Sequence, residues 1–104
     1  MKATYGFRAT MNARPGKGDE LTQTLLSAVE PGGPASNPEC VFFVVARSLS
    51  NRDVVHVTEG WTSKEAHAEN FARETSRTFT AKLGALVGDA QYGDDVPVGG
   101  KFNL

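Results

Sequence analysis

The segment VVHVTEGWTSKEAHAENF, residues 54–71, decides the fold that this sequence predicts. Its first eight residues alternate with the two-residue period of a β-strand, and one face of that strand carries Val55, Val57, Glu59 and Trp61. Thr62 and Glu65 stand three residues apart, as in a capping box at the start of a helix. We therefore predict that the strand ends at Trp61 and leads directly into a helix that carries His67. Together they would form one wall of a pocket.

Upstream of this segment, the sequence predicts a strand followed by a helix. Residues 3–11 alternate apolar and polar side chains, which indicates a strand with one packed face. Arg14-Pro15-Gly16-Lys17-Gly18 is typical of a turn because of its proline and glycines. Residues 19–29 carry apolar side chains at helical spacing. The stripe consists of Leu21, Leu25, Ala28 and Val29.

A second strand is predicted from the run CVFFVVA, residues 40–46. A continuous run of apolar, strand-forming side chains is typical of a central strand that is covered on both faces. Residues 48–53, SLSNRD, then form a hairpin-like connection into the strand that ends at Trp61.

Downstream, the helix that carries His67 is predicted to reach about Ala72, and another helix begins near Ser76. The buried stripe of that second helix is Phe79, Leu83, Leu86 and Val87. Gly88 stands where a helix C-cap is expected, and residues 89–92 form a short last strand. We predict a domain over residues 1–92 and a tail over residues 93–104. Phe102 and Leu104 suggest that the tail docks on the domain or on a partner.

The predicted order is strand, helix, strand, strand, broken helix, strand. This order indicates a ferredoxin-like α+β fold, with an antiparallel sheet and helices on one face. The apolar strand at residues 40–46 then leaves its other face uncovered. A second copy of the chain is the simplest cover, since a twofold axis pairs one patch with itself. We therefore predict a homodimer.

Composition excludes several classes of function. A chain of 104 residues fits one domain with a single core. Its net charge of −1 and its lack of a basic cluster argue against nucleic acid as a partner. No apolar run approaches the ~18 residues of a membrane helix, and the first residues do not resemble a signal peptide. Cys40 is the only cysteine, which is compatible with a reducing cytoplasm.

Trp61 and His67 are the candidate functional residues. The indole supplies a flat surface and an N–H donor, and an imidazole can take a proton near neutral pH. Asn70 follows His67 by one helical turn and can reach the same pocket. Each of the three also has a structural interpretation, as a packing or surface residue. We expect no metal and no cofactor, because the sequence has neither a cluster of Cys and His at ligand spacing nor a Gly-rich nucleotide loop.

The segment PGKGDEL at residues 15–21, the pair Glu59-x-Trp61, and His67 six residues after the tryptophan resemble the antibiotic biosynthesis monooxygenase family over residues 4–92. The resemblance implies a dimeric α+β barrel that oxygenates quinols, anthrones or related phenolic rings with dioxygen, without metal or flavin. The substrate would lie between sheet and helices. The implied catalytic residues are His67 and Trp61, and the implied substrate-binding residues are Trp61, Asn70, Phe71 and Val57.

Two positions depart from the anthrone oxygenases of that family. Those enzymes carry an asparagine four residues before the tryptophan and a tyrosine six residues after it, where this chain has Val57 and His67. Valine cannot hold a substrate oxygen as an amide does. Two alternatives therefore remain open: an isomerase or other acid–base enzyme that acts on a small carbonyl compound, and a non-catalytic dimeric module that binds small molecules.

Overall fold

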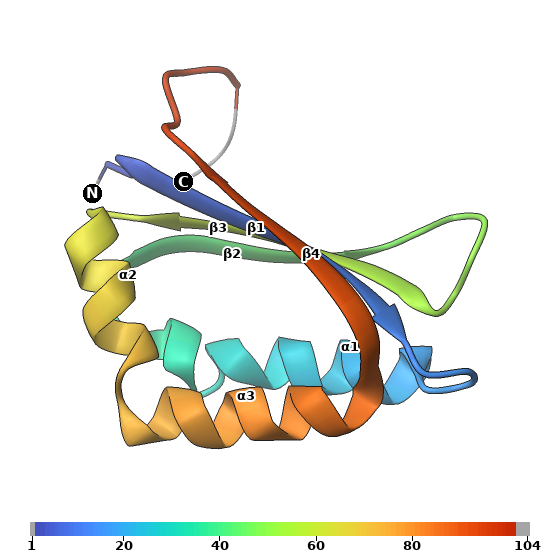
Figure 1. Cartoon of the computed structure of the whole chain (residues 1–104). Coiled ribbons are helices and arrows are strands. Elements are labelled where there is room, and N and C mark those ends of the chain that lie inside the picture. The colour runs from blue at the N-terminus through green and yellow to red at the C-terminus, as the bar shows by residue number, and fades with distance from the viewer. Residues whose placement is uncertain (1, 102–104) are drawn as a thin grey trace.

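The predicted order of elements is the order in the structure, a computed structural model that describes residues 2–101 (Figure 1). Four strands form one antiparallel sheet in the order β2-β3-β1-β4. The elements are β1 (Tyr5–Ala13), α1 (Gly18–Leu26), β2 (Cys40–Arg47), β3 (Val54–Trp61), α2 (Lys64–Phe71), α3 (Glu74–Leu86) and β4 (Val87–Asp95). Short 3₁₀ turns cover Ser27–Val29 and Pro34–Ser36. This arrangement confirms the ferredoxin-like α+β fold.

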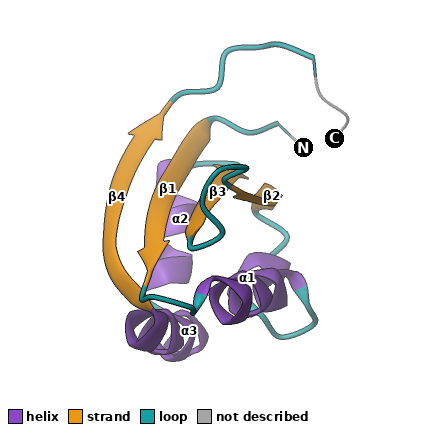
Figure 2. Ribbon diagram, turned by 90° about the vertical axis from the view of Figure 1, so that its right-hand side faces the viewer, coloured by secondary structure: helices purple, strands orange, loops and turns teal. Residues whose placement is uncertain are grey.

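All three α-helices lie on one side of the sheet. Figures 1 and 2 show α1 and α3 side by side beneath it, while α2 descends from the end of β3 and closes one end of the space between the two layers. The core fills the other end, where the inner sheet face meets α1 and α3. Its buried members are Ala9, Met11, Leu21, Leu25, Val55, Val57 and Leu86. None of the helices within residues 2–101 has the length and apolar character needed to cross a membrane.

Strand β2 is an edge strand, so the prediction of a central strand was wrong. The central strands are β3 and β1, and β2 pairs only with β3. Phe43 and Val45 pack against the core, whereas Val44 on the opposite face is 55% exposed. The Phe42 ring covers Gly60, where an added Cβ would collide with it. Residues 40–46 are thus apolar on both faces of the strand, while only the inner face packs against the core.

Strand β4 is longer than the predicted strand at residues 89–92. It pairs with β1 from Val87 to Asp95, and Gly88 lies within it instead of capping a helix. Its glycines and aspartates are poor strand formers, so pairing with a central strand overrides local preference here. The predicted docking of the tail stays a prediction, because Phe102 and Leu104 lie outside the described residues.

Two helix boundaries also differ from the predicted ones. The first helix gives way to a 3₁₀ turn at Ser27, with Ala28 buried beneath it. The cap of α2 is Ser63 and not Thr62: the Ser63 hydroxyl oxygen accepts a hydrogen bond from the Ala66 N–H at 3.0 Å. The helix nevertheless begins directly after Trp61, as predicted, and ends at Phe71.

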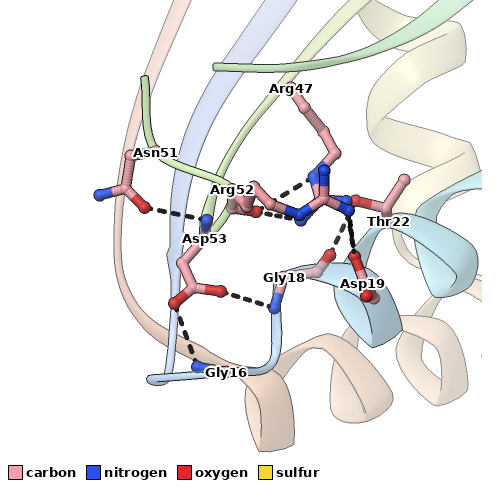
Figure 3. Close-up of polar contacts among 8 residues, drawn as sticks. All are labelled: Gly16, Gly18, Asp19, Thr22, Arg47, Asn51, Arg52 and Asp53. Carbon is pink, nitrogen blue, oxygen red and sulfur yellow. Dashed lines mark hydrogen bonds and ion pairs between the residues drawn. The ribbon is translucent and has the colours of Figure 1, made fainter. Parts of the chain in front are cut away.

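A carboxylate from the β2–β3 connection holds the start of α1 (Figure 3). The Asp53 side chain accepts hydrogen bonds from the backbone N–H groups of Gly16, at 3.0 Å, and Gly18, at 2.9 Å. Lys17, at the N-cap position, contributes no side-chain bond. Gly18 lies so close to the β2–β3 connection that a Cβ on it would collide with the Arg52 carbonyl oxygen.

Salt bridges reinforce the same junction. Arg47 at the end of β2 and Arg52 in the connection both bind one oxygen of Asp19, at 2.7 and 2.9 Å. The guanidinium of Arg47 also donates to the Arg52 carbonyl oxygen. We refer to the contacts among Gly16, Gly18, Asp19, Arg47, Arg52 and Asp53 as the α1 clasp.

Candidate functional site

A cavity of about 630 Å³ lies between the sheet and the helices. This volume is within the usual range of ~300–1,000 Å³ for small-molecule sites. Apolar side chains form most of its wall, from Phe7, Met11 and Val57 on the strands to Phe79 and Leu83 on α3. The polar groups Glu59, Trp61 and His67 meet near the start of α2. The volume and the lining suit a small apolar molecule with one polar end.

Trp61, Glu59 and His67 form a contiguous group at that end. Trp61 and Glu59 share the inner face of β3, and the Trp61 indole N–H donates to Oε1 of Glu59 at 2.9 Å. Nε2 of His67, on α2, lies 3.9 Å from the same Glu59 oxygen. The turn at residues 62–63 brings the helix back over the end of the strand, so the strand–helix segment does bring Trp61 and His67 together.

The His67 imidazole lies among aromatic rings. Its centroid is 5.4 Å from that of Trp61, in an edge-on arrangement, and 5.2 and 5.0 Å from those of Tyr5 and Phe7 on β1. Phe71, one turn further along α2, is 6.5 Å away. These rings restrict the orientation of the imidazole and keep water from most of it, because only 17% of the His67 side chain is exposed.

Burial shifts both titratable groups toward their uncharged forms. It raises the pKa of the Glu59 carboxyl, and the hydrogen bond from Trp61 opposes this rise. It lowers the pKa of His67, and the negative charge of Asp94 on β4 opposes that change. A neutral imidazole is the form that can accept a proton, so this environment favours the basic form of His67 near neutral pH.

The other predicted substrate-binding residues also line the cavity. Val57 is 2% exposed and lies on the inner face of β3, while Phe71 is 60% exposed and stands where the cavity meets solvent. The structure therefore places all five predicted site residues around one space: Val57, Trp61, His67, Asn70 and Phe71. Their roles in binding and catalysis stay predictions.

Asn70 has an additional structural task that its sequence position did not reveal. Its side-chain N–H donates to the Pro34 carbonyl oxygen at 3.0 Å, and its side-chain oxygen accepts from the Asn37 amide at 3.0 Å. The Ser76 hydroxyl donates to the Asn70 backbone oxygen at 2.6 Å. The amide thus fastens the loop before β2 to the end of α2 through its oxygen and one of its two N–H groups.

Sequence analysis placed Glu59 on the same strand face as Trp61 but assigned it no role in the site. A signal was available in the sequence, because Glu59 alternates with Val57 and Trp61 on the strand face that is expected to be buried. Phe7 and Tyr92, from strands far apart in the sequence, also line the cavity, and their rings stack at 5.9 Å. Within residues 2–101, no group of three His, Cys, Asp or Glu side chains is placed to hold a metal ion.

Comparisons with known proteins agree with this architecture. A protein from Chloroflexus aurantiacus J-10-fl, assigned to the antibiotic biosynthesis monooxygenases, is 29% identical, with 96% of this chain and 98% of that one covered and a TM-score of 0.82. SnoaB from Streptomyces nogalater, a cofactor-independent oxygenase whose structure is that of a point mutant, shares the fold at 16% identity and a TM-score of 0.77, with 99% and 98% covered.

A search of curated protein sequences finds no match. The family model described as antibiotic biosynthesis monooxygenase matches residues 4–82, which is most of the chain. The chain therefore belongs to the antibiotic biosynthesis monooxygenase family.

Proposed function

We propose that this protein is a cofactor-independent monooxygenase that acts on a quinol, an anthrone or a related phenolic molecule. The observation that carries the proposal is the largely apolar cavity whose polar end holds Glu59, Trp61 and His67. Burial lowers the pKa of His67 and so favours its neutral form. Membership of the family and the fold shared with SnoaB support the same reaction class. A flat phenolic ring fits the apolar wall and presents its hydroxyl group to the imidazole.

The reaction assigns distinct tasks to the side chains. Nε2 of His67 takes the proton of the substrate hydroxyl, and the resulting anion passes one electron to dioxygen. The two radicals then combine to form a C–O bond, and the peroxide accepts the proton from the imidazolium before it loses water to leave a carbonyl. Both reducing electrons of this sequence come from the substrate. Trp61 and Phe7 orient the ring, and the enclosing aromatic side chains exclude water from the intermediates.

The competing candidate is an acid–base enzyme, such as an isomerase of a small carbonyl compound. The observation in its favour is the proximity of Glu59 and His67 at 3.9 Å, because two proton-exchanging groups can move a proton between two substrate atoms without dioxygen. The two candidates differ in a single measurable quantity, the consumption of dioxygen.

Oxygen uptake tests the proposal directly. Chelator-treated, flavin-free protein is mixed with a panel of quinols and anthrones in an oxygen-electrode cell. We expect saturable uptake, with one dioxygen consumed for each substrate converted to a ketone or quinone. Product formation without uptake would favour the acid–base enzyme. If neither uptake nor product forms across the panel, this proposal is wrong for these substrates and the binding module gains support.

We also propose that the protein is a homodimer whose subunits meet through the outer sheet face. Val44 and Ala46 of β2 are exposed, and they alternate with Phe43 and Val45, which pack against the core. Sedimentation at micromolar concentration is expected to give about twice the chain mass of 11.1 kDa.

Val44→Glu should shift the protein to monomer, since it places charges in the contact. Leu49→Glu, at a fully exposed site in the β2–β3 connection, serves as control and should remain dimeric. A monomeric parent protein would contradict the proposal.

A further inference from the structure

The cavity needs a hydrogen-bond donor for the substrate oxygen, because deprotonation leaves negative charge there. Most polar lining side chains have already used their donors. Ser76 and Thr80 donate to the backbone oxygens of Asn70 and Ser76, the Asn70 amide donates one of its two N–H groups to Pro34, and the Trp61 indole donates to Glu59. Tyr92 lines the cavity from β4, on a side where 65% of the residue is exposed. At the buried polar end, Glu59 and His67 remain for the substrate.

We propose that Glu59, as a neutral carboxylic acid, is a second catalytic residue that donates a hydrogen bond to the substrate oxygen while His67 takes the proton. This inference rests on the proposed function, since it concerns the same phenolic oxygen. The O–H bond of the substrate breaks, its proton binds Nε2 of His67, and the electron pair stays on oxygen. The O–H bond of Glu59 remains intact and points at the new anion.

The geometry accommodates one oxygen atom in contact with both groups. Nε2 of His67 and Oε1 of Glu59 are 3.9 Å apart. An atom at the ~2.8 Å of a typical hydrogen bond from each of two such centres fits between them. A protonated Oε1 can accept the Trp61 N–H through a lone pair and donate its own O–H to the atom between it and His67. Trp61 thereby orients the carboxyl group and leaves its donor for the substrate.

The surroundings favour the protonated carboxyl. Only 14% of the Glu59 side chain is exposed, and its burial disfavours the ionised form. The titratable groups that face it supply no fixed positive charge: His67 on α2, Tyr5 on β1 and Cys40 on β2, with Asp94 of β4 beyond them. Burial raises the pKa of the Cys40 thiol to about 12 and, together with Asp94, raises the pKa of Tyr5, so both groups stay uncharged near neutral pH. A buried acid that stays neutral and stabilises an oxyanion is an established catalytic device.

A titration that needs no substrate tests the central requirement. Carboxyl carbons are labelled with ¹³C, the Glu59 signal is assigned by its loss in Glu59→Gln, and the spectrum is followed with pH. We expect Glu59 to be the last side-chain carboxyl to ionise and to remain protonated at the pH of maximal activity. If Glu59 ionises together with exposed carboxyls such as Glu65, the inference is overturned even when oxygen uptake is found.

Variants then test the donor itself. Glu59→Leu removes the donor and is expected to lower kcat by ~10²–10³, the usual effect of losing one donor to an oxyanion. Glu59→Gln keeps an N–H donor that does not ionise, so it should lose at least tenfold less and should abolish the fall in rate at high pH. Glu65→Gln, on the exposed side of α2, is the control and should match the parent protein.

The outcomes separate this inference from the proposed function. Full activity in Glu59→Leu would remove Glu59 from the mechanism while the oxygenase assignment stands. If no quinol or anthrone is oxygenated, the variants are compared by the pKa of bound 2-naphthol, read from its fluorescence. We then expect a higher naphthol pKa in Glu59→Leu than in the parent, and an equal pKa or failure of the parent to bind naphthol would overturn the donor role.

Discussion

Trp61→Ala is expected to lower the free energy of unfolding by about 3–5 kcal/mol and to abolish most substrate binding. Trp61 is 1% exposed, lies opposite Tyr5 on β1 and Cys40 on β2, and forms part of the cavity wall. Its loss enlarges the cavity and removes the hydrogen bond to the buried Glu59 carboxyl. Both effects destabilise the folded state, because a buried polar group loses a partner and apolar atoms lose their contacts.

Urea denaturation followed by circular dichroism measures this loss, since Trp61 is the only tryptophan and its fluorescence disappears with the substitution. Trp61→Phe is the matched control: it retains a ring but lacks the N–H donor, so it should lose distinctly less stability. A Trp61→Ala protein within about 1 kcal/mol of the parent would show that the indole is not the packing centre that its burial indicates.

His67→Ala is expected to fold as the parent does, yet to turn over substrate ~10²–10⁴ times more slowly, because the proposed general base is lost. The His67 side chain is smaller than the indole and is 17% exposed, whereas Trp61 is 1% exposed, so its removal should cost less stability than the loss of Trp61. The chain offers a close control in His56, its only other histidine, which is exposed on the outer sheet face beside Thr10. His56→Ala should retain the parent rate.

The pH dependence of the parent rate tests the same assignment. Burial lowers the pKa of His67, so the basic form persists to lower pH than in an exposed histidine. The rate should therefore fall on acidification only below the ordinary histidine value of ~6.5. Added imidazole is expected to restore part of the rate in His67→Ala, since the deletion leaves space at the polar end of the cavity. Unchanged turnover in His67→Ala would remove the residue from the mechanism, and a large drop in its melting temperature would identify it as a core residue.

The sequence predicted the wall of the site well because local rules governed it. Alternation placed Val57, Glu59 and Trp61 on one face, and the immediate start of α2 limited how far His67 could lie from Trp61. The ring contact between Trp61 and His67 follows from these two facts. When a strand leads into a helix within two residues, the number of residues between two side chains closely limits the distance between them.

The remaining features depend on partners that are far apart in the sequence. The position of β2 at the sheet edge follows from strand order, which its own apolar run does not encode. The length of β4 comes from pairing with β1, and the hydrogen bonds of Asn70 come from the loop at residues 34–37. The uncharged tendency of Glu59 arises from burial under α2, which local composition cannot reveal.

Because of the α1 clasp, we expect the first helix to form late in folding and to depend on the β2–β3 connection. Helix α1 spans only nine residues and is capped by Asp53, a residue 35 positions after Gly18, so on its own it is too short to persist in water. It gains its cap only when the β2–β3 connection has closed against it. An opening of that connection would fray the first turn of α1 and loosen Leu21 and Leu25, which pack beneath the sheet. We therefore expect the end of the molecule that holds the α1 clasp to open and close as one cooperative unit.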